Sequence, residues 1–128
     1  MNKEKGKFGE LAAEKYLVRK GFKVVAKNYH SRYGEIDIIA SSEDCMVFVE
    51  VKLRKRGFFC SGREAVSNSK RKRILKTALT FLSKTRGNFN TRFDVIEIQN
   101  IENANGGAIN DVVHLENAFT LNDIYNAA

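Results

Sequence analysis

The chain has no proline and no tryptophan, and only two of its 128 residues are cysteines. Cys45 and Cys60 are too few for a disulfide framework, and neither belongs to a Cys/His cluster with the spacing of a zinc site. No uncharged apolar run approaches the roughly 20 residues that a membrane helix needs, and the charged N-terminal segment leaves no apolar core for a signal peptide. We therefore expect a single cytoplasmic domain over residues 1–128 with no membrane partner.

Basic residues are missing from one end of the chain. Residues 1–92 contain all 22 Lys and Arg residues, with a charge balance of +13, whereas residues 93–128 contain none and have a balance of −6, which gives a formal net charge of +7. A positive field over part of a small domain favours a polyanionic partner, because each neutralised phosphate releases counterions. A solvated basic surface would have the same composition, so charge alone leaves nucleic-acid binding open.

Hydrophobic periodicity predicts two helices and five strands. Apolar residues at helical spacing predict one helix over about 5–20, followed by Gly21 as its C-terminal cap, and a second over about 67–85 with Ser67 or Asn68 as N-cap. Alternating apolar residues predict strands at 22–26, 34–40, 46–54, 92–98 and 111–119. The expected fold class is α/β, a mixed β-sheet flanked by helices in the order α-β-β-β-α-β-β.

Charged residues alternate with valine in the predicted central hairpin. By the period of two, Glu50 and Lys52 share one face of their strand. A four-residue connection over 41–44 pairs Ala40 with Cys45 and places Asp37 opposite Phe48. Asp37 and Glu50 are then diagonal neighbours on one face, with backbones roughly 7–8 Å apart. The same register puts Glu35 opposite Glu50, where it either joins the site or pairs with a basic residue.

Two carboxylates on one sheet face repel each other, and burying them without a partner is costly. A Mg²⁺ ion removes that cost, because it takes oxygen ligands in octahedral geometry and keeps waters for a phosphate substrate. Lys52 would then bring positive charge to the attacking water and to the phosphorus. The alternative is a surface hairpin in which Glu50 and Lys52 form a solvent-exposed pair of little energetic value.

The segments 34–40 (GEIDIIA) and 47–52 (VFVEVK) resemble the PD-(D/E)XK nuclease signature, with Ile36 standing where the signature has proline. More narrowly, the chain resembles the bacterial YraN family, which is similar to archaeal Holliday-junction resolvases. The likeness covers nearly the whole chain and includes Gly9-Glu10, Ala13, Tyr16-Leu17, Asn28, Glu64-Ala65-Val66, Lys70, Arg92-Phe93-Asp94-Val95 and Asn117-Ala118-Phe119.

This resemblance implies a restriction-endonuclease-like fold and an enzyme that hydrolyses DNA with Mg²⁺ or Mn²⁺, at branched or otherwise distorted structures. It makes Asp37, Glu50 and the backbone carbonyl of Val51 the metal ligands, and Lys52 the catalytic lysine. It brings Glu10 to the site from the first helix, although the residues alone favour a solvated helix carboxylate. Because resolvase-like relatives engage two-fold substrates, it also points to a homodimer.

Seven basic residues are candidates for nucleic-acid binding: Arg32, Arg54, Arg56, Arg63, Lys70, Arg71 and Arg73. The run 70–73 lies in the first turn of the predicted second helix, where the macrodipole disfavours cations, so we expect these side chains to find anions elsewhere, phosphates above all. The resemblance makes Lys70 the member that faces the active cleft. A solvated helix end is the alternative interpretation.

Three functions stay open at this point. The first is a Mg²⁺-dependent endonuclease. The second is a nucleic-acid-binding module with a nuclease-like fold and no useful turnover, which would bind DNA with a steep salt dependence. The third is a scaffold that recruits another protein, because fold likeness alone does not establish function.

Overall fold

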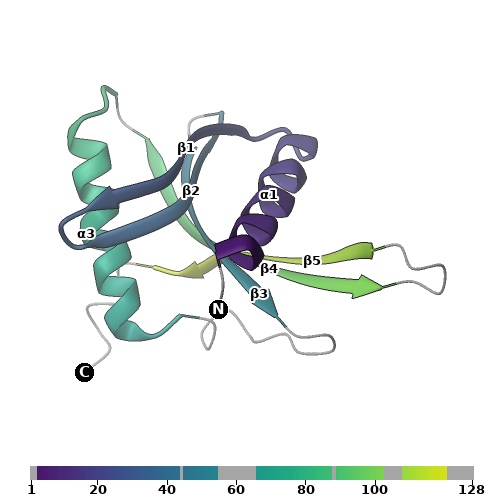
Figure 1. Cartoon of the computed structure of the whole chain (residues 1–128). Coiled ribbons are helices and arrows are strands. Elements are labelled where there is room, and N and C mark those ends of the chain that lie inside the picture. The colour runs from purple at the N-terminus through teal and green to yellow at the C-terminus, as the bar shows by residue number, and fades with distance from the viewer. Residues whose placement is uncertain (1–2, 44, 55–65, 88, 103–107, 121–128) are drawn as a thin grey trace.

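The computed structural model describes residues 3–43, 45–54, 66–87, 89–102 and 108–120. Its elements follow the predicted order: α1 (Lys3–Arg19), β1 (Lys23–Ser31), β2 (Gly34–Ser42), β3 (Cys45–Arg54), α3 (Asn68–Ser83), β4 (Asn90–Glu102) and β5 (Ala108–Phe119). The expected fold class, a mixed sheet flanked by two helices, is confirmed (Figure 1). Neither helix within these ranges is long and apolar enough to cross a bilayer.

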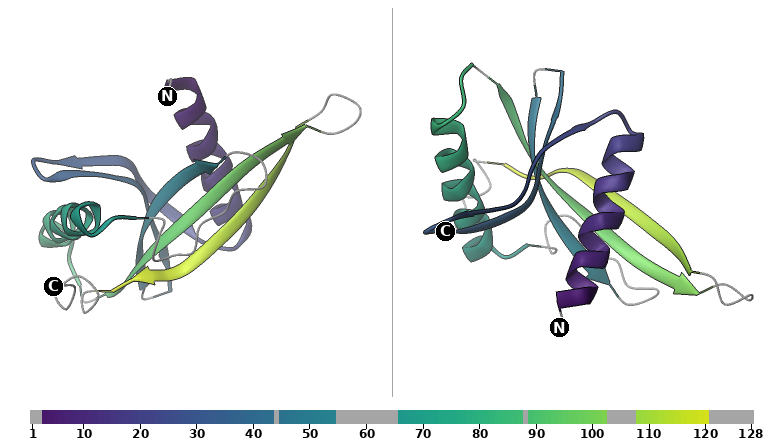
Figure 2. Two further views of the ribbon diagram at one scale, coloured as in Figure 1. Left: turned by 90° about the horizontal axis from the view of Figure 1, so that it is seen from below. Right: turned by 45° about the horizontal axis from the view of Figure 1, so that its top comes forward.

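The five strands lie side by side in the order β1-β2-β3-β4-β5. All neighbouring pairs are antiparallel except β3 and β4, which are parallel. Parallel neighbours require a long crossover connection, and here the connection contains α3. Helices α1 and α3 lie on opposite sides of the strongly twisted sheet, and the β1–β2 hairpin curls over α3 (Figure 2).

The predicted capping residues lie at the end of α1 and at the start of α3. Gly21 has φ of +94°, and the amides of Gly21 and Phe22 donate to the carbonyls of Val18 and Leu17, each at 3.0 Å. Glycine adopts this left-handed conformation without the Cβ penalty, so the chain turns directly into β1. At the start of α3, the Ser67 hydroxyl accepts a hydrogen bond from the Lys70 amide at 3.3 Å, as an N-cap does.

Each helix buries its apolar side against one face of the sheet. On the α1 face, Ala13 and Leu17 pack against six fully buried strand residues: Ile38, Ala40, Val47, Val49, Ile96 and Ile98. On the α3 face, the helix packs against the apolar ends of β2, β3 and β4, through Ile74, Leu75, Ala78 and Phe81. The sheet is therefore buried on both faces where these helices cross it.

A buried ionic network joins β4, β5 and α1. Asp94 is fully buried, and it accepts hydrogen bonds from Arg92 Nε at 2.9 Å, Arg92 Nη2 at 2.8 Å and the Asn117 amide at 3.0 Å. Its Oδ2 also lies 2.6 Å from His114 Nε2, and His114 Nδ1 lies 3.0 Å from the Tyr16 hydroxyl of α1. Burial alone raises the pKa of Asp94, but the hydrogen bonds from His114, Arg92 and Asn117 together hold it below the ordinary value.

We predict that Asp94→Ala lowers the free energy of unfolding by about 3 kcal/mol near neutral pH, because it leaves the partners of a buried carboxylate unpaired. Since the pKa of Asp94 is depressed in the folded state, its stabilisation is present above the ordinary aspartate pKa of about 4 and is lost as the pH falls through the folded-state value. Urea denaturation of wild type and variant across this pH range measures both effects.

The matched control is Asp111→Ala, which removes an exposed carboxylate from β5. It should change the free energy of unfolding by no more than about 0.5 kcal/mol. Equal effects of the two substitutions would contradict the structural role of Asp94.

Candidate functional site

The sheet face that α3 covers changes from apolar to charged partway along β2 and β3. Ile39 and Phe48 belong to the core beneath α3. On the same face, β2 presents Asp37 two residues before Ile39, and β3 presents Glu50 two residues after Phe48. Lys52 follows Glu50 on this face of β3. Asp37 and Glu50 are only 9% and 7% exposed. Two buried carboxylates therefore lie where the apolar core ends.

The pairing of β2 with β3 differs from the predicted register. Ala40 pairs with Val47, and both strands continue to the pair Ser42–Cys45, so that only residues 43 and 44 connect them. Three predicted pairs are therefore wrong by two residues: Ala40–Cys45, Asp37–Phe48 and Glu35–Glu50. A shift of two residues leaves every side chain on its predicted face, because the side-chain period of a strand is two.

In the observed register, Asp37 and Glu50 are cross-strand neighbours instead of diagonal ones. They follow directly after the pair Ile38–Val49, the last pair of the ladder. The Asp37 carboxylate lies against the β3 backbone, where its Oδ2 accepts a hydrogen bond from the Val51 amide at 2.8 Å. The two acids are thus closer than the sequence predicts.

Burial and the neighbouring Glu50 together raise the pKa of Asp37. Burial raises the pKa of this carboxyl most, and the negative charge of Glu50 raises it further, whereas the hydrogen bond from the Val51 amide lowers it. The result is a pKa of about 7 instead of the usual value near 4. A carboxylate pair of this kind holds either a shared proton or a cation.

Two lysine ammonium groups face the acids. Lys70 Nζ of α3 donates to Glu50 Oε1 at 2.9 Å, and Lys52 Nζ lies 3.9 Å from the same oxygen. Burial lowers the pKa of Lys52 more than the charge of Glu50 raises it, and Lys70 lowers it further. Burial also lowers the pKa of Lys70, but the hydrogen bond and charge of Glu50 outweigh burial and raise it. Lys70 therefore finds its anion within the protein, which the sequence alone does not reveal.

These groups line a cavity of about 330 Å³ formed by α1, β2, β3 and α3. Its lining residues are Gly9, Glu10, Glu35, Asp37, Glu50, Val51, Lys52, Leu53 and Lys70. All the residues predicted to be catalytic or metal-binding lie around this one cavity, here called the carboxylate pocket; their chemical roles stay predictions. Glu35 lines the pocket, and its carboxylate also lies 2.7 Å from His30 Nε2. It therefore lies at the predicted site and also has a basic neighbour, which were the two alternatives for this residue.

The donor set of the carboxylate pocket is small. Within the described ranges, no three Asp, Glu, His or Cys side chains are grouped closely enough to hold a metal ion by themselves, so Glu10 does not complete such a cluster. Asp37 and Glu50 offer carboxylate oxygens alone. Mg²⁺ is commonly bound by one or two carboxylates together with waters and substrate phosphate, whereas a structural zinc site needs four nitrogen or sulfur ligands. The residues present therefore fit Mg²⁺ or Mn²⁺.

Besides Lys70, two of the basic residues predicted to bind nucleic acid have partners inside the protein. Arg71 is only 5% exposed; its Nε donates to the Val66 carbonyl at 2.9 Å, and its guanidinium lies 5.3 Å from the centre of the Phe119 ring. The packed side of α3 takes Arg71 into the interior, which does not favour the predicted contact with nucleic acid. Arg54 Nε lies 3.4 Å from the fully buried carboxylate of Glu97, whose charge it neutralises.

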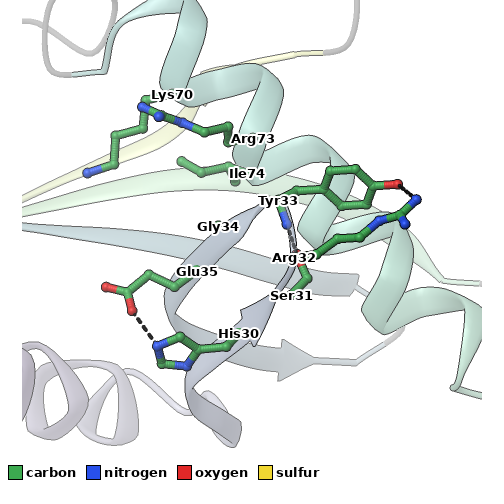
Figure 3. A pocket seen from close by; sticks show the side chains of 9 residues that line it. All are labelled: His30, Ser31, Arg32, Tyr33, Gly34, Glu35, Lys70, Arg73 and Ile74. Carbon is green, nitrogen blue, oxygen red and sulfur yellow. Dashed lines mark hydrogen bonds and ion pairs between the residues drawn. The ribbon is translucent and has the colours of Figure 1, made fainter.

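Two other members of the set lie on the surface. Arg32, in the β1–β2 turn, and Arg73 of α3 are exposed, and together with Lys70 they line a second cavity next to the carboxylate pocket (Figure 3). Arg56 and Arg63 lie outside the described residues. Tyr33 lines the same cavity but was not among the residues predicted from the sequence. Its position next to Arg32 in a two-residue hairpin turn could have indicated a partly exposed aromatic side chain.

The fold and the pocket together define a mixed α/β domain with a buried acid–lysine site where strands β2 and β3 leave the core. Residues 9–98 match the family described as "Uncharacterised protein family UPF0102", and the chain belongs to this family, which includes the YraN proteins. This match contains every residue that lines the carboxylate pocket. The expected resemblance to the YraN family is thus confirmed, whereas the likeness to nucleases and resolvases stays a prediction.

Bacterial relatives match over nearly their whole length. A UPF0102 protein of Sulfurihydrogenibium sp. is 44% identical over 92% of this chain and 96% of its own. A UPF0102 protein of Clostridioides difficile is 45% identical over 92% of this chain and 98% of its own, and one of Legionella pneumophila is 39% identical over 93% and 97%.

We predict that Asp37→Asn stabilises the protein above neutral pH. The amide oxygen can still accept the Val51 hydrogen bond, while the repulsion from Glu50 is lost. Because the pKa of Asp37 is raised to about 7, the folded protein keeps a proton that the unfolded chain releases above about pH 4, and wild-type stability falls as the pH rises through this window. The variant should be more stable by about 1–3 kcal/mol at about pH 8 and nearly equal near pH 4, measured by urea denaturation.

Glu14→Gln serves as the control, since Glu14 pairs with Lys27 at 3.2 Å on the surface. It should show no comparable change with pH. A wild type that is more stable than Asp37→Asn at alkaline pH would refute the proposed repulsion.

Proposed function

We propose that the protein is a nuclease that hydrolyses DNA phosphodiester bonds with Mg²⁺ or Mn²⁺. The observation that carries this proposal is the pair of buried carboxylates, Asp37 and Glu50, on adjacent strands, with Lys52 beside them in an open pocket. The likeness of segments 34–40 and 47–52 to the PD-(D/E)XK signature supports the same chemistry. The resemblance to junction resolvases favours branched DNA among the substrates.

Each residue of the carboxylate pocket has a proposed task. Asp37 and Glu50 hold the ion through their oxygens, and the resemblance adds the carbonyl of Val51. A divalent ion supplies charge stabilisation at phosphate oxygens and a more acidic water when it is bound. Lys52 keeps positive charge within 4 Å of Glu50 and directs it at the charge that develops on the phosphate. Glu10, on the α1 wall, orients water or ligand from the other side.

Burial explains why these groups would be effective together. Asp37 and Glu50 are more than nine-tenths buried, and Lys52 and Lys70 are partly buried. Charges interact more strongly in such a site than in bulk water. The hydrogen bond from the Val51 amide also fixes the Asp37 carboxylate on the rigid sheet, so the acid is positioned before any ligand enters.

We predict that purified protein cleaves at least one substrate in a panel of duplex, forked, junction and single-stranded DNA when Mg²⁺ or Mn²⁺ is present. Asp37→Asn and Glu50→Gln should each lower the cleavage rate by about 100-fold or more, because each removes a ligand of the ion. Titration calorimetry should show weaker metal binding by both variants. Gel assays with labelled strands measure the cleavage.

Glu14→Gln is again the matched control and should cleave at the wild-type rate, since its carboxylate lies outside the pocket. Cleavage that persists unchanged in Asp37→Asn, or a wild type that cleaves nothing on the whole panel, would end the enzymatic proposal.

One observation favours a second function, a nucleic-acid-binding module without turnover. Lys70 already neutralises Glu50 through a 2.9 Å ion pair, so the carboxylates do not strictly need a metal ion. In a module of this kind, the lysines would be permanent counter-ions of the buried acids, and DNA binding would rest on the basic surface alone.

Removing the competing ammonium separates the two functions. If the pocket is a metal site, Lys70→Gln frees Glu50 and should raise the Mg²⁺ affinity about 3- to 10-fold, because one opposing charge leaves the site. If Lys70 is a permanent counter-ion, wild type should bind no Mg²⁺ and only the variant should do so. Titration calorimetry with MgCl₂ on both proteins distinguishes the outcomes, and Lys72→Gln, on the exposed side of α3, is the control.

A further inference from the structure

A second cavity, of about 420 Å³, lies between the β1–β2 turn and α3 (Figure 3). Its lining residues are His30, Ser31, Arg32, Tyr33, Gly34, Glu35, Lys70, Arg73 and Ile74. Two of them, Glu35 and Lys70, also line the carboxylate pocket. The two cavities are therefore adjacent, with Glu35 and Lys70 in the wall that they share. This second space is called the turn groove below.

The turn groove is built by close docking of the turn on the helix. Gly34 has φ of +154°, a conformation that favours glycine, and a Cβ on it would lie in contact with Arg73 Cβ at 3.4 Å, so the turn backbone lies close to α3. The Ser31 hydroxyl lies 2.8 Å from that of Thr77, and it also accepts a hydrogen bond from the Tyr33 amide at 3.0 Å. These contacts fix the turn backbone, so the groove is preformed.

Tyr33 stands at the edge of the turn groove and belongs to neither of the two buried core clusters. Arg32 Cζ and Lys76 Nζ lie 4.9 Å and 5.4 Å from the centre of its ring, and Arg32 Nη2 donates to its hydroxyl at 2.7 Å. An aromatic ring that is held among cations at the surface, and not used in the core, can offer a face to another π system.

A row of cations leads from this ring to the carboxylate pocket. Lys70, Arg73 and Lys76 follow one another at intervals of three residues along α3. At about 1.5 Å of rise per residue, the row spans about 9 Å of the helix axis. This length is enough for the row to reach more than one phosphate of a strand that follows the helix.

We infer that the turn groove binds a single-stranded segment of DNA that adjoins the cleavage site. Arg32, Arg73 and Lys76 contact its phosphates, and Tyr33 stacks on an unpaired base. Stacking of this kind requires a base whose face is not covered by neighbours in a duplex, and aromatic rings interleaved with cations bind single strands without sequence preference. The inference rests on the proposed function and deepens it, because it names DNA with an unpaired segment as the substrate class.

Fluorescence anisotropy with labelled oligo-dT and with a hairpin duplex tests the inference in EDTA, where no cleavage occurs. Tyr33→Leu should weaken oligo-dT binding by about 5- to 100-fold, the effect of losing one base stack, while Tyr33→Phe binds like wild type. Arg73→Gln should weaken binding and reduce the salt slope by about 0.7 for the phosphate contact it loses. Lys72→Gln removes the same charge from the exposed side of α3 and should change the affinity about twofold or less.

Unchanged oligo-dT binding by folded Tyr33→Leu, or equal losses for oligo-dT and duplex, would overturn the inference. Circular dichroism establishes folding. If Tyr33→Leu does not fold, photo-cross-linking of iododeoxyuridine in the oligonucleotide to wild type decides the matter, since the cross-link must map to Tyr33. A different result would contradict the nuclease proposal alone. In that case wild type cleaves nothing with Mg²⁺ or Mn²⁺, while oligo-dT binding in EDTA still depends on Tyr33 and Arg73.

Discussion

The side-by-side burial of Asp37 and Glu50 is the constraint on which the rest of the site depends. A tight hairpin makes them cross-strand neighbours, and their low exposure removes the water that would screen their repulsion. The protein meets this cost with a raised pKa at Asp37, a backbone hydrogen bond and two lysines. An interior that needed only stability would contain apolar residues here, and this retained cost supports the cation site proposed above.

The position of α3 follows from the same constraint. Its first turn carries Lys70 where the helix dipole disfavours a cation by roughly 0.3–1 kcal/mol. The hydrogen bond from Lys70 to the buried carboxylate of Glu50 offsets that cost. The β3–α3–β4 crossover therefore begins at the charged end of the sheet face, with Ser67 as its N-cap, and then covers the apolar end with Ile74, Ala78 and Phe81.

The sequence predicts which face of the sheet a side chain occupies better than it predicts which residues that side chain contacts. Period-two alternation places Asp37, Glu50 and Lys52 on one side, and this survives an error of two residues in the register because two is the period itself. The register error arose because the polar residues 41–42 read as loop, yet they extend β2. The burial of Arg71 and the pairing of Lys70 with Glu50 depend on how α3 docks, which no local pattern encodes.

Lys70 lines both cavities and links the functions proposed for them. In the structure its ammonium is bound to Glu50, and its side chain also lines the turn groove. On the functions proposed above, an ion held by Asp37 and Glu50 would take over the neutralisation of Glu50, and the ammonium would then be available to a phosphate in the groove. Metal and nucleic acid would each strengthen the binding of the other, since such coupling is reciprocal. On this proposal, Lys70 neutralises the acids when the site is empty, and the ion neutralises them when both ligands are present, while the ammonium pairs with the phosphate.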